Sequence, residues 1–249
     1  MSTRSRVSSW RRSSVILQAA GGCPAFWHHR ESIEMNLKNA EPENFGPVKT
    51  FFYRLWAEPS VDPMHRRIAG EVPIDCGRLL DIGCGAGKLD RLIAAARPNL
   101  HAVGLDSSEP MIRAARKNSD LPNLEFHVGT VEQSGSSDEF DFALTVLSFH
   151  HWEEPEETLA AVHRALVPGG RFWIYEMDPD ASAQAIRADR GRVWGFFRIP
   201  VGIQRRMARD HGFTIREVDA VVRPVVGRTP FADLHVTRTG STLRLELVR

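Results

Sequence analysis

The feature that most constrains the fold is an alternation of short apolar runs with amphipathic stretches through the middle of the chain. Apolar or alternating runs predict strands over residues 78–82, 101–105, 124–128, 140–147 and 171–177. The stretches between them repeat apolar side chains at helical spacing. Because strands and helices that alternate at this spacing form a parallel sheet with helices on both faces, the sequence predicts a doubly wound α/β fold.

Capping and turn residues set the limits of the helices between these strands. One helix is predicted over 88–97. A second begins after Ser108, a residue that caps helix N-termini, and runs through Lys117. A third begins at Pro155 and ends before the turn at 168–170, which contains a proline and two glycines.

The C-terminal part of the chain gives weaker signals. We predict a helix over 201–210 and two closing strands over 213–221 and 242–248. The pairing of 231–238 stays open; one possibility is a further strand in a hairpin that turns at 239–240.

Composition excludes several classes of protein. The 249-residue chain has 32 Lys and Arg residues against 31 Asp and Glu residues, a net charge of +1, so no nucleic-acid partner is expected. No apolar run approaches the roughly 18 residues of a membrane span. The three cysteines, Cys23, Cys76 and Cys84, form no CxxC pair. This excludes a disulfide scaffold and a cysteine-rich zinc site, and favours a reducing, cytoplasmic location.

The N-terminal residues differ in composition from the rest. Residues 1–30 contain five arginines, six serines and no acidic residue, which is typical of an organellar transit peptide or a disordered tail. The alternative is a misassigned start, with Met35 as the true first residue. In either case we exclude 1–34 from the fold and expect one domain over 35–249, with its core at about 77–177.

A glycine-rich loop follows the first predicted strand. Its alternate glycines are Gly83, Gly85 and Gly87. Asp81 precedes the loop, and Asp106 ends the second strand. Ligands of such folds bind outside the carboxyl ends of the strands, where an acid can accept both hydroxyls of a ribose. The structural alternatives are a loop-capping role for Asp81 and a helix N-terminal role for Asp106. Nicotinamide-dependent enzymes use G-x-G-x-x-G, and here Lys88 replaces the last glycine.

Four segments in this order resemble one family. They are LLDIGCGAGKL at 79–89, VGLDSSEPMI at 103–112, FDFALTVLSFHHW at 140–152 and LVPGGRFWIYEMD at 166–178. Together they resemble the class I S-adenosylmethionine-dependent methyltransferases, of the small-molecule, type 11/25-like kind. The resemblance implies a Rossmann-like seven-stranded sheet with an antiparallel last strand. It also implies S-adenosyl-L-methionine as the cofactor.

The resemblance also implies which residues hold the cofactor. The glycine loop would contact the methionine part and the ribose, Asp106 the ribose hydroxyls, and Thr130 with Val131 the adenine. Many members of the family have an acid where Thr130 stands, which puts the adenine contact in doubt. The full set is Asp81, Gly83, Cys84, Gly85, Gly87, Asp106, Ser107, Met111, Thr130, Val131 and Leu147. We interpret Cys84 as a small filler beside the cofactor.

The implied activity is in-line transfer of the sulfonium methyl group to a small-molecule acceptor. Such a reaction needs a general base only where the accepting atom must lose a proton, and His150 and His151 are the candidates. Their alternative role is helix capping or packing, and no metal site is expected there. The alternative functions are a non-catalytic S-adenosylmethionine-binding module and an NAD(P)-dependent oxidoreductase.

Two segments are candidates for substrate recognition. Residues 45–68 carry apolar stripes at helical spacing, which are also typical of a core-packed helix. Residues 184–209 hold seven arginines against one acid, which favours an acidic acceptor unless the arginines form a solvated face.

Overall fold

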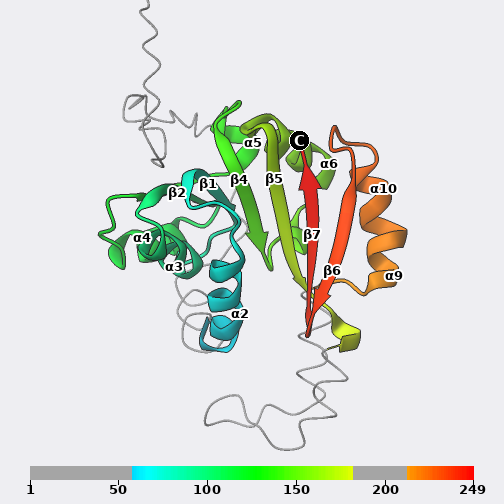
Figure 1. Ribbon diagram of the computed structural model, residues 1–249, viewed down its shortest axis with the longest axis horizontal. Helices are drawn as coiled ribbons and strands as arrows, with labels where there is room; N and C mark the ends of the chain where they lie inside the picture. The colour runs from blue at the N-terminus through cyan, green and yellow to red at the C-terminus, as the bar shows by residue number, and fades with distance from the viewer. Residues whose placement is uncertain (1–57, 182–211) are drawn as a thin grey trace, which may run out of the picture.

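The computed structural model describes residues 58–181 and 212–249 (Figure 1). The predicted tail at 1–34, the predicted helix over 201–210 and the arginine-rich segment at 184–209 lie outside these residues, as does most of the segment at 45–68. The domain boundary at residue 35 and the acidic character of the acceptor therefore stay predictions. No helix in the described part is both long and apolar enough to cross a membrane.

A seven-stranded sheet forms the centre of the fold, in the order β3-β2-β1-β4-β5-β7-β6. The first five strands are parallel to one another, and β7 runs antiparallel to both β5 and β6. This confirms the predicted doubly wound sheet with an antiparallel last strand. The strands are β1 Cys76–Ile82, β2 Asn99–Asp106, β3 Leu124–Val128, β4 Phe140–Val146, β5 Leu166–Met177, β6 Leu234–Thr239 and β7 Thr242–Val248.

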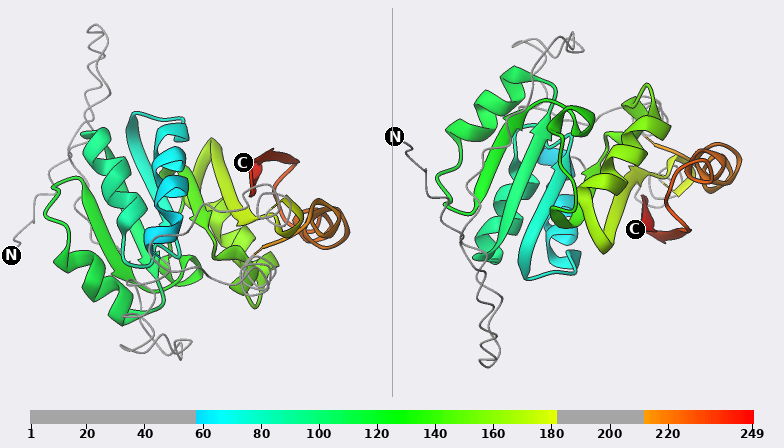
Figure 2. Two further views of the ribbon diagram at one scale, coloured as in Figure 1. Left: turned by 90° about the horizontal axis from the view of Figure 1, so that it is seen from below. Right: turned by 90° about the horizontal axis from the view of Figure 1, so that it is seen from above.

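Helices cover both faces of the sheet (Figure 2). One face packs against α2 Glu58–Glu71, α3 Lys88–Ala96 and α4 Glu109–Lys117. The other packs against α5 Val131–Ser134, α6 Pro155–Ala165, and the C-terminal helical segment. That segment consists of α9 Ile215–Glu217, the π-helix η3 Val218–Val222 and α10 Arg223–Val226. Because both faces are covered, most of each central strand is buried, which explains the apolar runs.

Local signals place the helix ends where the sequence predicted them. Ser108 caps α4: its side-chain oxygen accepts a hydrogen bond from the backbone N–H of Met111 at 3.5 Å, and Pro110 lies in the first turn. A turn at Gly240 and Ser241 closes a β6–β7 hairpin, with Gly240 at φ +61°, so the hairpin possibility for this region is confirmed one residue further along the chain.

The strand predicted over 213–221 is wrong, because the chain there is helical from Ile215 onward. Thr214 and Glu217 form a reciprocal capping box that starts the helix. Its buried side chains, Val218, Val222 and Val226, are four residues apart, so they share one helical face.

Candidate functional site

The glycine loop after β1 is closely packed at its first and last glycines, Gly83 and Gly87, and has open space beside the middle one, Gly85. Gly83, Gly85 and Gly87 all have positive φ values, +77°, +55° and +70°. A Cβ atom on Gly83 would overlap the side chain of Ser148, and one on Gly87 would overlap the ring of Phe126. At Gly85, by contrast, no described atom lies within 4 Å of the Cβ position. The half-buried loop therefore has open space beside its backbone at Gly85.

Asp106 ties this loop to the end of β2. Its Oδ2 accepts a hydrogen bond from the Gly85 amide at 2.8 Å, and its Oδ1 accepts one from the Ser108 amide at 2.8 Å. Burial raises the pKa of Asp106, and these two amides act in the opposite direction by stabilising the carboxylate. The side chain is partly exposed and each oxygen has a second lone pair. Asp106 can thus accept two further hydroxyl groups beside the open centre of the loop.

Asp81 and Asp90 form a buried pair of carboxyl groups. They are 2% and 0% exposed, and they lie close enough for each to influence the pKa of the other. Burial, with the Asp90 charge second, raises the pKa of Asp81 well above its usual range; burial also raises the pKa of Asp90 to about 7. Two carboxylates cannot both be charged in so buried a place, so the pair holds a proton at neutral pH. Asp81 Oδ1 has no hydrogen-bond partner within the described residues.

The thiol of Cys84, in the same loop, is a poor nucleophile. Burial raises the pKa of its thiol well above the usual range, and the nearby Asp90 carboxylate adds to that effect. The thiolate that a nucleophilic role requires is therefore disfavoured. This agrees with the interpretation of Cys84 as a small filler.

The segment after β4 carries unusual backbone geometry. Leu147 has a φ of +53°, a region that residues other than glycine rarely occupy, and its amide donates to the Tyr175 carbonyl at 2.8 Å. Such strain costs of order 1–3 kcal/mol and gathers at functional sites. The bend directs the chain into the short 3₁₀ helix η2 Phe149–His151, which holds both predicted histidines.

His150 is paired with a buried glutamate from β5. Its Nδ1 lies 2.8 Å from Glu176 Oε2, and its backbone N–H donates to Glu176 Oε1 at 3.2 Å. Glu176 is 0% exposed and the side chain of His150 is 8% exposed. Burial raises the pKa of Glu176, and the His150 ring and the amides of His150 and Phe149 counteract it. His151 is exposed, and its ring centroid lies 4.0 Å from that of His150.

The remaining predicted residues lie at the ends of β2 and β3. Ser107 is exposed, and Met111 is buried in the first turn of α4. The Gly129 amide donates to the Asp106 carbonyl at 3.0 Å, which holds the end of β3 beside that acid. Thr130 then starts α5, while the side chain of Val131 packs in the core.

Sequence reasoning missed Glu176 and Asp90. Both are acids on otherwise apolar faces: Glu176 ends the buried run of β5, and Asp90 shares the buried face of α3 with Ile93. An acid in such a position is rarely buried without a partner, and this was the available signal. Its partner is far away in sequence in the case of Glu176, so the pair appears only in the folded chain.

Comparison with known proteins places this site in a family. The profile of a methyltransferase domain matches residues 80–174. A ubiquinone biosynthesis O-methyltransferase of Maricaulis maris is 31% identical over 165 residues, covering 65% of this chain and 62% of that protein. A phthiotriol/phenolphthiotriol dimycocerosates methyltransferase of Mycobacterium tuberculosis is 30% identical over 127 residues, covering 51% and 47%. The chain thus spans less than two thirds of the length of these curated relatives.

Solved structures share the fold at low identity. A SAM-dependent methyltransferase from Aquifex aeolicus superposes with a TM-score of 0.56 at 16% identity, covering 82% of this chain and 99% of the other. Human N-acetylserotonin methyltransferase, solved in complex with SAM, gives a TM-score of 0.59 at 14% identity, covering 82% and 56%. The family match covers the glycine loop, Asp106 and the η2 segment, so residues 80–174 form a methyltransferase domain of the class I S-adenosylmethionine-dependent kind, whose cofactor is S-adenosylmethionine.

Proposed function

We propose that the protein transfers the sulfonium methyl group of S-adenosylmethionine to a small-molecule acceptor by in-line displacement. The observation that carries this proposal is the link between Asp106 and Gly85, 2.8 Å long, which joins an acid at the end of β2 to the open centre of the glycine loop. The names of the relatives, which are methyltransferases of small molecules, support the same conclusion.

The residues present fit the cofactor. The carboxylate of Asp106 matches the two hydroxyls of a ribose, and the open space beside the half-buried Gly85 suits a closely approaching ligand. The predicted contacts of Ser107, Met111 and Thr130 belong to the same proposal. When bound, S-adenosylmethionine supplies a methyl group already activated by the positive sulfur, so no activation of the electrophile is required of the protein.

The task of the chain is then alignment. Holding the acceptor atom in line with the methyl group converts a bimolecular reaction into an effectively unimolecular one, worth up to about 7–11 kcal/mol of barrier in favourable systems. The strained Leu147 and the η2 helix lie at the end of β4, next to the end of β1 in the sheet. We assign the acceptor-facing part of the site to this segment.

The structure gives Lys88 a role that does not suit dinucleotide binding. Lys88 occupies the position where the G-x-G-x-x-G pattern has a glycine, and its ammonium forms an ion pair with Asp62 of α2. The side chain therefore helps to join α2 to the loop. This observation favours the methyltransferase over the nicotinamide-dependent alternative.

Calorimetric titration of the full chain tests the proposal. We expect micromolar binding of S-adenosylmethionine and S-adenosylhomocysteine and no binding of NADH. Positive binding justifies a screen of acceptors with a labelled methyl donor. NADH binding would overturn the proposal in favour of an oxidoreductase, and cofactor binding without transfer to any acceptor class would favour the non-catalytic module.

A further inference from the structure

Strand β3 ends the sheet on one side and has no further neighbour there among the described strands. Its bonds to β2 fix which of its backbone groups point outward. The Ala102 amide of β2 donates to the Asn123 carbonyl at 2.9 Å. Alternate residues of an edge strand bond to the neighbouring strand in a parallel pair, so odd-numbered residues of β3 bond to β2. The backbone N–H and C=O groups of residues 124, 126 and 128 therefore point away from the sheet.

An arginine from α4 covers the middle of this outer edge. The guanidinium of Arg116 donates to the Phe126 carbonyl through Nε at 3.0 Å and through Nη2 at 2.6 Å. Both hydrogen bonds have a charged donor, which makes them stronger than bonds between neutral groups. Arg113, on the same helix, instead forms an ion pair with Glu109. Contact with the strand edge is thus a property of Arg116 and is not shared by the helix's other arginine.

The opposite edge strand, β6, has a similar contact. Arg223 Nη1 donates to the Leu234 carbonyl, at the start of β6, at 3.1 Å. An edge strand with unpaired N–H and C=O groups is a template on which another chain can add a strand, and proteins protect such edges with charged side chains. Arginine side chains therefore cover a backbone carbonyl at both edges of the described sheet.

The sequence of β3 is complementary to itself in an antiparallel pairing. A two-fold axis at Phe126 would place Glu125 of one copy opposite His127 of the other, and Leu124 opposite Val128. An acid would thus face a histidine, and an apolar residue would face an apolar one; both combinations favour pairing. The side chains of Glu125 and His127 are 54% and 25% exposed. At the centre, each Phe126 carbonyl would accept a hydrogen bond from the Phe126 amide of the second copy.

We propose that Arg116 closes the β3 edge against a second copy of this chain, which would otherwise add its own β3 as an antiparallel strand centred on Phe126. The guanidinium lies where the amide of the second copy would have to approach the Phe126 carbonyl. Without it, the central carbonyl of the edge is free to accept that amide. If Arg116 served only to fix α4 on β3, its loss would lower the stability of the fold and cause no association.

The first test is sedimentation equilibrium of the full chain at rising protein concentration. Relative to the unmodified protein, we expect the mass of Arg116→Met to rise toward twice the starting value. Exchange of the Phe126 amide with solvent should slow by about tenfold or more over the same range, because that amide becomes paired. Arg113→Met removes an arginine from the same helix without freeing a strand carbonyl, and should sediment like the unmodified protein. Arg116→Lys keeps a charged donor and should associate less than Arg116→Met.

The second test adds His127→Glu to Arg116→Met. This change puts an acid opposite Glu125 of the second copy, twice in each pair of chains, and like charges directly opposite each other destabilise pairing. We expect the double variant to return to the mass of the unmodified protein. Association that persists in the double variant, or an Arg116→Met protein whose mass and Phe126 exchange do not change with concentration, would overturn the proposal. Should Arg116→Met fail to fold, Arg116→Lys with and without His127→Glu decides by the same two measurements.

Discussion

Asp106 is the residue on which the cofactor proposal depends most, because it joins two backbone amides from different elements. Its replacement by alanine would leave ribose hydroxyls without acceptors and release the Gly85 amide. We expect Asp106→Ala to weaken S-adenosylhomocysteine binding by about 1–3 kcal/mol, measured by calorimetry. Asp120→Ala, at an exposed position, is the control and should bind normally. Equal affinities for both variants would remove Asp106 from the site.

Gly85 and Gly87 allow a matched comparison within one loop. Both have positive φ, so alanine costs about 1–2 kcal/mol of backbone strain at either position. Only at Gly87 would the added Cβ overlap the Phe126 ring. We expect Gly87→Ala to lose clearly more unfolding free energy in urea titrations, and Gly85→Ala to lose ligand affinity while remaining folded. Equal losses of stability would contradict the close approach at Gly87.

Residues differ in how far the sequence alone reveals them. Asp106 was predictable because its neighbours in sequence, a buried strand and a helix cap, already set its position. Glu176 was not predictable, because its role depends on contact with His150, which lies 26 residues earlier in the chain. That contact forms only because the bend at Leu147 brings η2 to the end of β5. Candidate bases can thus be named from the sequence, whereas the groups that orient them can be identified only from contacts in the folded structure.

At the scale of elements, strands were predicted closely where apolar and polar residues alternate. The runs 124–128 and 242–248 coincide with β3 and β7, because alternate side chains of a strand point to the same face and those on the better covered face are apolar. The prediction of a strand over 213–221 was wrong because the valines in this segment favoured a strand. The capping box at Thr214 and the four-residue spacing of Val218 and Val222 specify a helix instead.

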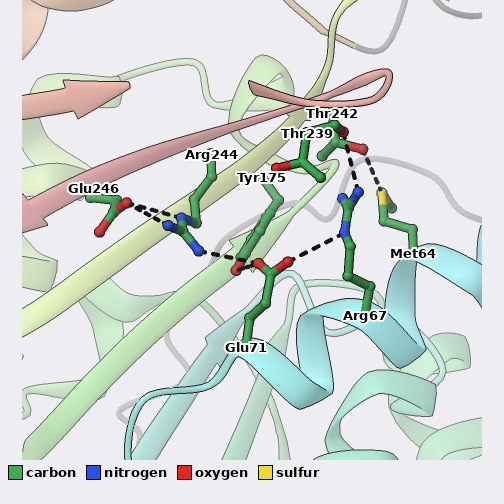
Figure 3. A network of polar contacts seen from close by, with 8 residues as sticks. All are labelled: Met64, Arg67, Glu71, Tyr175, Thr239, Thr242, Arg244 and Glu246. Atoms are coloured by element: carbon green, nitrogen blue, oxygen red, sulfur yellow. Dashed lines mark hydrogen bonds and ion pairs between the residues drawn. The ribbon is translucent and has the colours of Figure 1, made fainter. Parts of the chain in front are cut away.

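Helix α2 is joined to the antiparallel edge of the sheet by a polar network around Glu71 (Figure 3). Glu71 Oε2 accepts from the Tyr175 hydroxyl at 3.1 Å and from Arg244 at 3.2 Å, and its Oε1 lies 3.5 Å from Arg67. Burial, with the Glu71 charge second, raises the pKa of Tyr175, so the phenol remains a donor. The network therefore connects α2 to β5 and β7 through one carboxylate.

We expect Glu71→Ala to lower the free energy of unfolding by about 1 kcal/mol, because three donors lose a partly buried acceptor. A double-mutant cycle with Tyr175→Phe should give a coupling energy of about 0.5–1.5 kcal/mol. Glu156→Ala removes an ion pair with Arg228 whose side chains are 55% and 45% exposed, and it should cause no measurable change. Additive effects of Glu71→Ala and Tyr175→Phe would show that the two side chains act independently.

At the scale of the whole molecule, the buried Asp81–Asp90 pair and the partly buried His65 set opposing pH dependences. Asp90 keeps its proton in the folded state up to a pH of about 7, against 3.8 for the free group, so stability falls as pH rises through that interval. Burial, with the Lys88 charge second, lowers the pKa of His65 from 6.5 to about 4. The unfolded state then binds the extra proton, and stability falls as pH drops through that interval. Between pH 4 and 6.5 the two contributions oppose each other.

Replacing Asp90 or His65 should therefore remove its contribution to the pH dependence of the unfolding free energy and leave that of the other residue. Relative to the unmodified protein, we expect Asp90→Asn to gain stability as pH rises from 4 to 7, reaching about 1–3 kcal/mol, because asparagine has no charge to bury. His65→Gln should gain instead as pH falls from 6.5 to 4. Urea titrations at pH 4.5, 6 and 7.5 measure both trends, with Asp120→Asn as an exposed control. Profiles parallel to that of the unmodified protein would show that Asp90 and His65 titrate alike in the folded and unfolded states. They would contradict the assignment of a proton to the Asp81–Asp90 pair at neutral pH.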